Sequence, residues 1–197
     1  MRLLIVFMLI VSLIPVIGCE APPDIVNDED FPLMGRVEEA LTVDGSSDGY
    51  PADPVQVAGG EVLMAHDGNY LYIHMQVEGS GWVSLGLVSR GGAMDGANMV
   101  LGYMDGETPA FRDDVGRGLS HSEAGTTAVA DFFMSQEDGV VIMEFAYPLT
   151  FPGGEGYNIE ELTPGEIYTL IAARHSTSNN IDQQHTARDS IDFTVEP

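Results

Sequence analysis

The sequence predicts an all-β protein, an immunoglobulin-like antiparallel β-sandwich of about eight to ten strands. Short runs that are apolar, or that alternate between apolar and polar residues, recur along the chain and are separated by Gly, Asp, Asn and Pro. No window longer than about ten residues has the 3.6-residue period of an amphipathic helix. With 44% apolar residues, 23 Gly and 11 Pro in 197 residues, the composition is that of a folded, turn-rich domain.

The expected strands follow one another with a turn signal between most of them. Residues 61–66 and 70–77 flank Asp67-Gly68-Asn69, a hairpin turn composition. Residues 81–88 alternate large apolar with small residues, as a strand packed in a sandwich does. The other expected strands are residues 98–104, 129–134, 140–147, 166–174 and 190–195. Turn residues stand at 105–106, 138–139, 152–154 and 164–165.

The first 18 residues differ from the rest, since they contain no acid and one cation, Arg2. Their apolar run, residues 3–14, is too short to span about 30 Å of hydrocarbon but fits the apolar region of a secretory signal. Val16-Ile17-Gly18-Cys19 resembles a lipobox, and Cys19 is the only cysteine. We therefore expect a lipoprotein signal peptide over residues 1–18 and lipidation at Cys19. The alternative is an ordinary signal peptide cleaved elsewhere.

The predicted location is outside the cytoplasm, as a membrane-tethered lipoprotein on the cell surface or the periplasmic face. Residues 19–36 are acidic and Pro-rich, which is typical of a tether, and residues 37–197 form the predicted domain. The chain has 31 acids and 7 basic residues, all Arg, and removing residues 1–18 takes its formal charge from −24 to −25. Such a charge excludes a nucleic-acid partner and favours a cationic one, such as a cationic redox protein.

Motifs of the common enzyme classes are absent from the sequence. It contains no Gly-rich phosphate loop, no HExxH and no GxSxG, and a chance pair among 31 acids cannot support a glycosidase. A single Cys also excludes a Cys-based zinc cluster and the Cys-x-x-Cys-His of covalently attached haem. An electron-transfer or ligand-binding domain is therefore expected rather than a stand-alone enzyme.

Three motifs appear in a characteristic order: Gly81-Trp82-Val83, then Met94-x-x-Ala-x-Met-Val-x-Gly-Tyr, and finally His185-Thr-x-Arg-x-Ser. In this order, over residues 41–196, the chain resembles the DOMON family. The resemblance implies a β-sandwich that holds haem b or a sugar at one end. In haem-binding members a Met and a His ligate the iron, and these positions correspond to Met94 and His185.

The resemblance implies a non-covalent haem b with both axial positions filled, which suits one-electron transfer. Residues expected to line the haem slot are Trp82, Leu85, Met99, Leu101 and Tyr103, with Arg188 as partner of a propionate. Met99 is the local rival of Met94 and His175 the rival of His185. His66 is expected in solvent, and His121, in a Gly/Ser-rich loop, needs no role. The alternatives are a carbohydrate-binding module, with Trp82, Tyr103, Tyr70 and Tyr72 as stacking faces, and a sandwich without a ligand.

Overall fold

The computed structural model describes residues 31–153 and 155–197, which form twelve β-strands and no helix. The predicted all-β sandwich is thus confirmed, with more strands than the eight to ten expected. The strands are β1 (Leu33–Arg36), β2 (Val55–Val57), β3 (Gly60–His66), β4 (Tyr70–Glu78), β5 (Val83–Ser89), β6 (Asn98–Asp105), β7 (Thr108–Arg117), β8 (Ser120–Glu123), β9 (Asp131–Glu137), β10 (Val140–Pro148), β11 (Ile167–Arg174) and β12 (Ala187–Val195). In these residues we find no helix that could cross a membrane.

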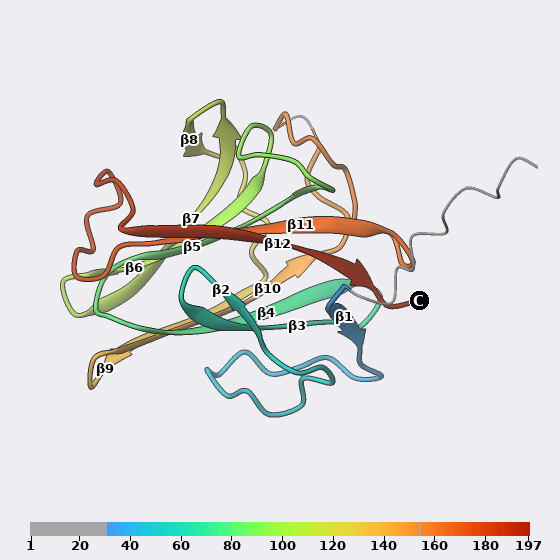
Figure 1. Ribbon diagram of the computed structural model, residues 1–197, viewed down its shortest axis with the longest axis horizontal. Coiled ribbons are helices and arrows are strands. Elements are labelled where there is room, and N and C mark those ends of the chain that lie inside the picture. Colours follow the sequence, from blue (N-terminus) through green and yellow to red (C-terminus); the bar gives the residue numbers. More distant parts are fainter. Residues whose placement is uncertain (1–30, 154) are drawn as a thin grey trace, which may run out of the picture.

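The strands form two layers, seen one above the other in Figure 1. Sheet A runs in the order β8-β7-β6-β5-β11-β12, and sheet B in the order β3-β4-β10-β9 with β2 paired to β3. Neighbours within each sheet are antiparallel, whereas β1 pairs parallel with both β12 and β3. Strand β1 therefore connects the layers along one side. It comes from residues 33–36, which the sequence places in the tether.

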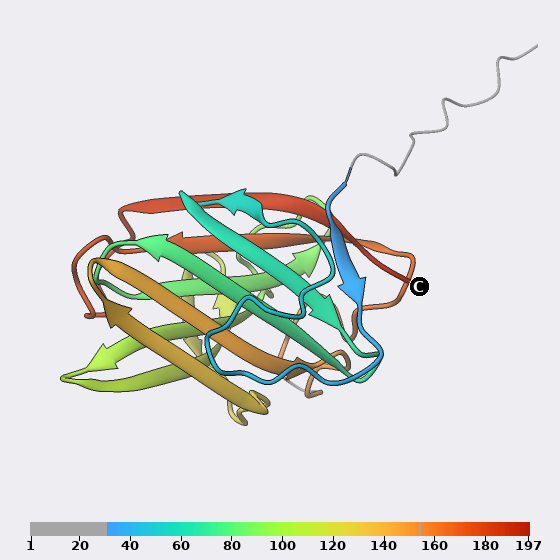
Figure 2. The same ribbon diagram turned by 90° about the horizontal axis from the view of Figure 1, so that it is seen from below.

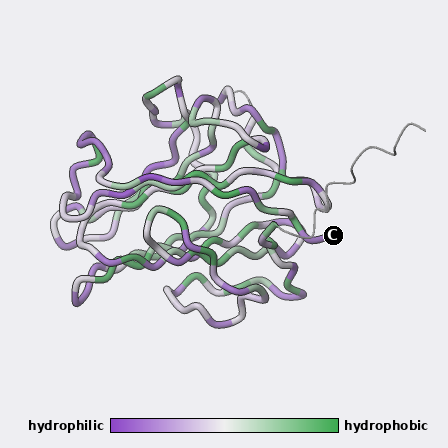
Figure 3. Tube along the Cα trace, in the orientation of Figure 1, coloured by the Kyte–Doolittle hydropathy of each residue, from purple (hydrophilic) through white to green (hydrophobic). Residues whose placement is uncertain are grey.

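The core lies between the layers and follows from the alternation of side chains along each strand. Leu85 and Leu87 of sheet A, for example, face Ile73 and Met75 of sheet B within one apolar cluster. Figure 3 shows the apolar residues concentrated along the strands and the polar residues along the connections. Burying one such side chain contributes about 1.5–3 kcal/mol. The residues between these core positions lie on the two outer faces of the sandwich.

The outer face of sheet B is covered by residues 37–54, which we call the strap (Figure 2). Apolar strap residues, among them Leu41 and Val43, pack on Tyr72 and Ala146 of the sheet. The strap is held by Glu144, which is fully buried and accepts hydrogen bonds from Asp44 N at 2.9 Å, Gly45 N at 2.7 Å and the Tyr50 hydroxyl at 2.9 Å. A buried carboxylate thus fastens the strap to strand β10.

Candidate functional site

A cavity of about 1020 Å³ lies on the outer face of sheet A, at the upper end of the range of about 300–1,000 Å³ usual for ligand and cofactor sites. Its floor is the sheet, and its walls are the β5–β6 loop, the β7–β8 hairpin and the β11–β12 loop. The lining residues are Trp82, Ser84, Gly92, Ala93, Met94, Met99, Arg112, Gly118, Leu119, Ser120, His121, Ser122, Glu123, Ile171, Ala172, Ala173, Ile181, Asp182, Gln183, Gln184, His185, Arg188, Asp189 and Ser190.

Strand register aligns the residues on the outer face of sheet A, beneath the cavity, in two rows. One row consists of Ser190, Ile171, Gly86, Met99 and Asp114, and the next of Arg188, Ala173, Ser84, Leu101 and Arg112. Gly86 has a packing role, because a Cβ there would lie 2.8 Å from Ile171 Cγ1 and 3.0 Å from Met99 Cγ. The missing side chain lets Ile171 and Met99 pack over strand β5 and close the apolar part of the floor.

Met94 enters the cavity from the β5–β6 loop, which is tied to strand β7. The Met94 carbonyl accepts a hydrogen bond from Ala97 N at 3.0 Å, and Gly96 N donates to Gly116 O of strand β7 at 3.0 Å. A Cβ on Gly116 would lie 1.6 Å from Met94 O, so only glycine allows this approach. The half-buried Met94 side chain packs against the cluster that contains Met99 and Leu101. The loop is thereby held in place by its backbone as well as by packing.

His185 enters the cavity from the opposite wall, at the end of the β11–β12 loop. Next to His185, two hydrogen bonds join the ends of this loop. Thr186 N donates to Arg174 O at 2.8 Å, and Ser176 N donates to Thr186 Oγ1 at 2.9 Å. His185 is half-buried. The fold thus brings Met94 and His185, which are far apart in the sequence, into one cavity.

The other residues expected at the slot divide into two groups. Trp82, Met99 and Arg188 line the cavity. Leu85, Leu101 and Tyr103 do not. Leu85 packs in the core between the sheets, Leu101 is 1% exposed because Met94 and Ile181 pack over its cluster, and Tyr103 lies farther along β6 toward the β6–β7 turn.

The two rival ligands also differ in position. Met99 belongs to the floor, while His175 lies outside the cavity lining. The His175 ring is engaged in its own turn, where Nδ1 accepts hydrogen bonds from Thr177 N at 3.2 Å and Ser178 N at 2.9 Å. Geometry therefore favours His185 over His175 as the histidine available to a ligand.

Sequence reasoning missed a polar cluster in the cavity made by Arg112, Asp114 and His121. Asp114 is fully buried, and Arg112 Nε donates to its Oδ1 at 2.9 Å while His121 Nδ1 is hydrogen-bonded to its Oδ2. Burial alone would raise the pKa of Asp114, but the hydrogen bonds and charges of His121 and Arg112 hold that pKa below its usual value. The sequence places His121 in a loop, whereas the structure places it in strand β8, where a buried carboxylate fixes it at the cavity.

Two buried polar atoms at the cavity wall have no hydrogen-bond partner among the described residues. They are Trp82 Nε1 and Ser84 Oγ, whose residues are 4% and 2% exposed. Leaving such a group unpaired costs about 1–3 kcal/mol. In residues 31–153 and 155–197, no three His, Cys, Asp or Glu side chains gather as a metal site.

Asp113 precedes Asp114 in the sequence, but its side chain faces the core, and its pKa shifts in the opposite direction from that of Asp114. It is 3% exposed and accepts hydrogen bonds from Ala128 N at 2.8 Å and the Tyr147 hydroxyl at 3.2 Å. Burial raises the pKa of Asp113 above its usual value. Folding therefore favours the protonated form of Asp113. This contribution to stability is fully present below the unfolded-state pKa of about 3.9 and is lost as pH rises through the folded-state pKa.

We expect Asp113→Asn to stabilise the protein at pH 7, because it removes the cost of ionising a buried acid. Unfolding followed by circular dichroism at pH 7 should show a Tm higher by about 2–4 °C, the shift that roughly 1 kcal/mol produces in a domain of this size. The advantage should vanish near pH 3, where Asp113 is protonated. An equal change in Tm at both pH values would contradict this assignment.

The fold and the cavity together define a class, a β-sandwich module with a cavity on the outer face of one sheet. The sequence matches the model of the DOMON domain over residues 62–175, and the chain belongs to the DOMON domain family. No curated protein matches it in a sequence search.

Solved structures with a similar fold include two cytochrome domains. The cytochrome b domain of pyranose dehydrogenase from Coprinopsis cinerea has a TM-score of 0.54 at 14% identity, covering 70% of this chain and 77% of that one. The cytochrome domain of cellobiose dehydrogenase from Myriococcum thermophilum has a TM-score of 0.54 at 11% identity, covering 81% and 80%. A family 9 carbohydrate binding module from Caldicellulosiruptor kristjanssonii, in complex with cellotriose, has a TM-score of 0.49 at 10% identity, covering 82% and 92%. At such identities the likeness to the two cytochrome domains shows a common fold alone.

Proposed function

We propose that this protein binds haem b non-covalently in the cavity on sheet A, with Met94 and His185 as axial ligands, and serves in one-electron transfer. The observation that carries the proposal is that one cavity holds both side chains, each on a loop closed by backbone hydrogen bonds. Family membership and the fold shared with two cytochrome domains support it.

The residues present fit such a group in several respects. A thioether and an imidazole are donors that haem iron accepts at its axial positions. The apolar side chains of Met99, Ile171 and Ile181 suit a macrocycle, and the cavity has the volume of a cofactor site. Arg188 is exposed at the cavity and forms no ion pair within the described residues, so it is available to a propionate.

When bound, haem supplies the one-electron chemistry. The chain itself supplies position and environment. Met94 and His185 would hold the haem iron, and their loops fix both donors at the cavity. The apolar floor excludes water, and Asp114 keeps Arg112 and His121 oriented at the wall. These roles describe an electron-transfer module rather than a stand-alone enzyme.

The chain contains a single Trp, and Trp82 lines the cavity, so its fluorescence tests the proposal. Titrating haem-free protein with haem should quench this fluorescence strongly and saturate at one haem per chain. Free tryptophan in the same buffer corrects for absorption by haem itself. Quenching that equals this correction, or that never saturates, would contradict binding in the cavity.

The carbohydrate alternative finds little support in this cavity. A sugar stacks on an exposed aromatic face, but Trp82 is only 4% exposed and Tyr103 does not line the cavity. Tyr70 and Tyr72, the other two aromatics expected to stack on sugar, lie on sheet B.

A cationic redox partner and a membrane anchor complete the proposal. Exposed acids at the cavity mouth, Glu123, Asp182 and Asp189, would attract a basic protein to the haem site. Lipidation at Cys19 and export remain predictions from the sequence, because residues 1–30 lie outside the described part of the chain.

A further inference from the structure

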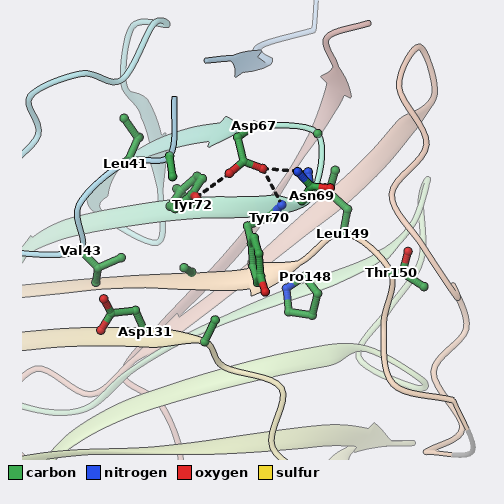
Figure 4. A pocket seen from close by; sticks show the side chains of 14 residues that line it. Leu41, Val43, Asp67, Asn69, Tyr70, Tyr72, Asp131, Pro148, Leu149 and Thr150 are labelled. Carbon is green, nitrogen blue, oxygen red and sulfur yellow. Dashed lines mark hydrogen bonds between the residues drawn. The ribbon is translucent and has the colours of Figure 1, made fainter. Parts of the chain in front are cut away.

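A second cavity, of about 610 Å³, lies on the outer face of sheet B at the margin of the strap (Figure 4). Its walls come from the strap, the β3–β4 turn, the start of β9 and the end of β10. The cavity lies on the opposite sheet from Met94 and His185, and none of the residues assigned to haem lines it. A ligand bound here would therefore be distinct from haem.

The formal charges in the lining of this cavity are all negative. Asp67 comes from the β3–β4 turn and Asp131 from the start of β9, whereas no Arg, Lys or His is among the lining residues. The chain as a whole carries a formal charge of −24, which adds to the attraction for cations at low salt. The cavity therefore favours a cation and repels an anion.

Asp67 keeps its charge because hydrogen bonds within the turn favour the ionised carboxylate. One carboxylate oxygen accepts hydrogen bonds from Asn69 N and Tyr70 N, each at 2.8 Å, and the other accepts one from the Tyr72 hydroxyl at 2.8 Å. Although partial burial would raise the pKa of Asp67, these hydrogen bonds lower it. Asp67 is thus negative at neutral pH, but both of its carboxylate oxygens already have donors.

Tyr70 offers the cavity an open aromatic face. Figure 4 shows its ring in the middle of the lining side chains, with Val43 and Asp131 on one side and Leu149 on the other. Tyr70 is 40% exposed, whereas its strand neighbour Tyr72 is 3% exposed. The face of an aromatic ring is electronegative and attracts a cation that lies over it. The ring and the two carboxylates therefore favour the same kind of ligand.

The rest of the lining indicates which kind of cation fits. A metal ion such as Ca²⁺ takes about six to eight oxygen ligands, but the lining contains only two acids, and the oxygens of Asp67 are engaged with protein donors. Leu41, Val43 and Leu149 supply apolar surface instead. A quaternary ammonium ion has methyl groups that suit this surface and no N–H group that would need the occupied oxygens. Aromatic sites bind such ions by cation–π attraction.

We propose that this cavity binds a small quaternary ammonium compound, with its positive charge over the Tyr70 ring and near the carboxylates of Asp67 and Asp131. The methyl groups of the ligand would pack on the apolar wall. This inference goes beyond the proposed function, because it uses none of the residues assigned to haem, and either proposal can fail without the other.

Calorimetric titration of the full chain with choline, at low ionic strength and without added haem, tests this site. We expect one saturable choline site per chain. Binding should weaken when salt is raised to about 150 mM, because part of the attraction is electrostatic. The neutral molecule 3,3-dimethylbutan-1-ol, which has the same shape as choline, should bind at least about tenfold more weakly.

Variants of the cavity make the result specific. Tyr70→Ala should weaken choline binding at least about threefold, whereas Tyr70→Phe, which keeps the ring, should stay within about twofold of the unmutated protein. Asp131→Asn should also weaken binding at least about threefold. The matched control, Glu137→Gln, removes the same charge from the exposed far end of β9, outside the lining, and should leave binding unchanged. Thermal unfolding of each variant checks that it is folded.

The proposal is overturned if choline does not bind with saturation, or if folded Tyr70→Ala binds it as well as the unmutated protein does. Equal binding of the neutral alcohol would also overturn it, because apolar contact alone would then explain binding. So would an equal loss in Glu137→Gln and Asp131→Asn, because choline would then respond only to the overall charge. A protein that binds choline at this site but binds no haem would keep this proposal and remove only the haem proposal.

Discussion

Replacing Glu144 with alanine is expected to lower the free energy of unfolding by roughly 3–5 kcal/mol, because it removes a fully buried carboxylate that accepts three hydrogen bonds. Asp44 N, Gly45 N and the Tyr50 hydroxyl would lose their partner, and the strap would lose its attachment to β10. Burial and the neighbouring Glu144 charge also raise the pKa of Tyr50, so its hydroxyl stays a donor at every pH of interest. Urea unfolding followed by circular dichroism measures the change.

Two variants make this result specific. Glu144→Gln keeps one side-chain carbonyl for the two backbone donors and should lose only about 1–2 kcal/mol. Glu137→Ala removes an exposed acid from neighbouring strand β9 and should stay within about 0.5 kcal/mol of the unmutated protein. If Glu144→Ala were as stable as Glu137→Ala, the strap would not depend on the buried carboxylate.

Replacing His185 with alanine is expected to abolish six-coordinate haem and to weaken haem binding at least about tenfold, because one of the two axial bonds is lost. Met94→Ala should also lose the six-coordinate spectrum, but with weaker effect on affinity, since a thioether is the weaker donor. Absorption spectra of each variant, oxidised and reduced, with haem added to equal occupancy, provide the measurement.

The matched controls are the rival residues. His175→Ala should keep the unmutated spectrum, because its ring is engaged in the turn at residues 175–178. Met99→Leu should do the same, because it keeps an apolar floor. A six-coordinate spectrum that persists in His185→Ala and is lost in His175→Ala would reverse the ligand assignment.

Much of the fold could be predicted because its signals are local. Asp67-Gly68-Asn69 between two apolar runs forms the β3–β4 hairpin, and the alternation of Leu85 and Leu87 with small residues places β5 correctly. The pairing of Met94 with His185 in one cavity is not local. It was expected only through the family motifs, since nothing in either loop alone indicates the other.

The sequence did not predict strands β7 and β8, because their charged side chains find partners only once the chain has folded. Arg112-Asp113-Asp114 has the composition of a solvated loop, yet Asp114 is buried against Arg112 and His121, and Asp113 faces the core. Strands β1 and β2 are short and pair with distant segments, so neither has a local signal.

The burial of two polar residues, His66 and Glu144, could not be predicted from local sequence either. His66, expected in solvent beside a turn, is 1% exposed and bonded through Nε2 to Glu196 O at 2.8 Å, a contact with the end of the chain. Glu144 alternates onto an outer face, which alone would predict exposure, but the strap covers it. Coverage by a segment remote in sequence cannot be read from strand periodicity.

The absorption spectrum of the unmutated full chain, expressed with haem supplied, tests whether Met94 and His185 hold a haem. We expect one tightly held, non-covalent haem per chain, with a Soret band and, after reduction, a sharp α band typical of six-coordinate b-type haem. A protein that is folded by circular dichroism yet shows no such bands, or only those of five-coordinate haem, would contradict Met94 and His185 as a ligand pair.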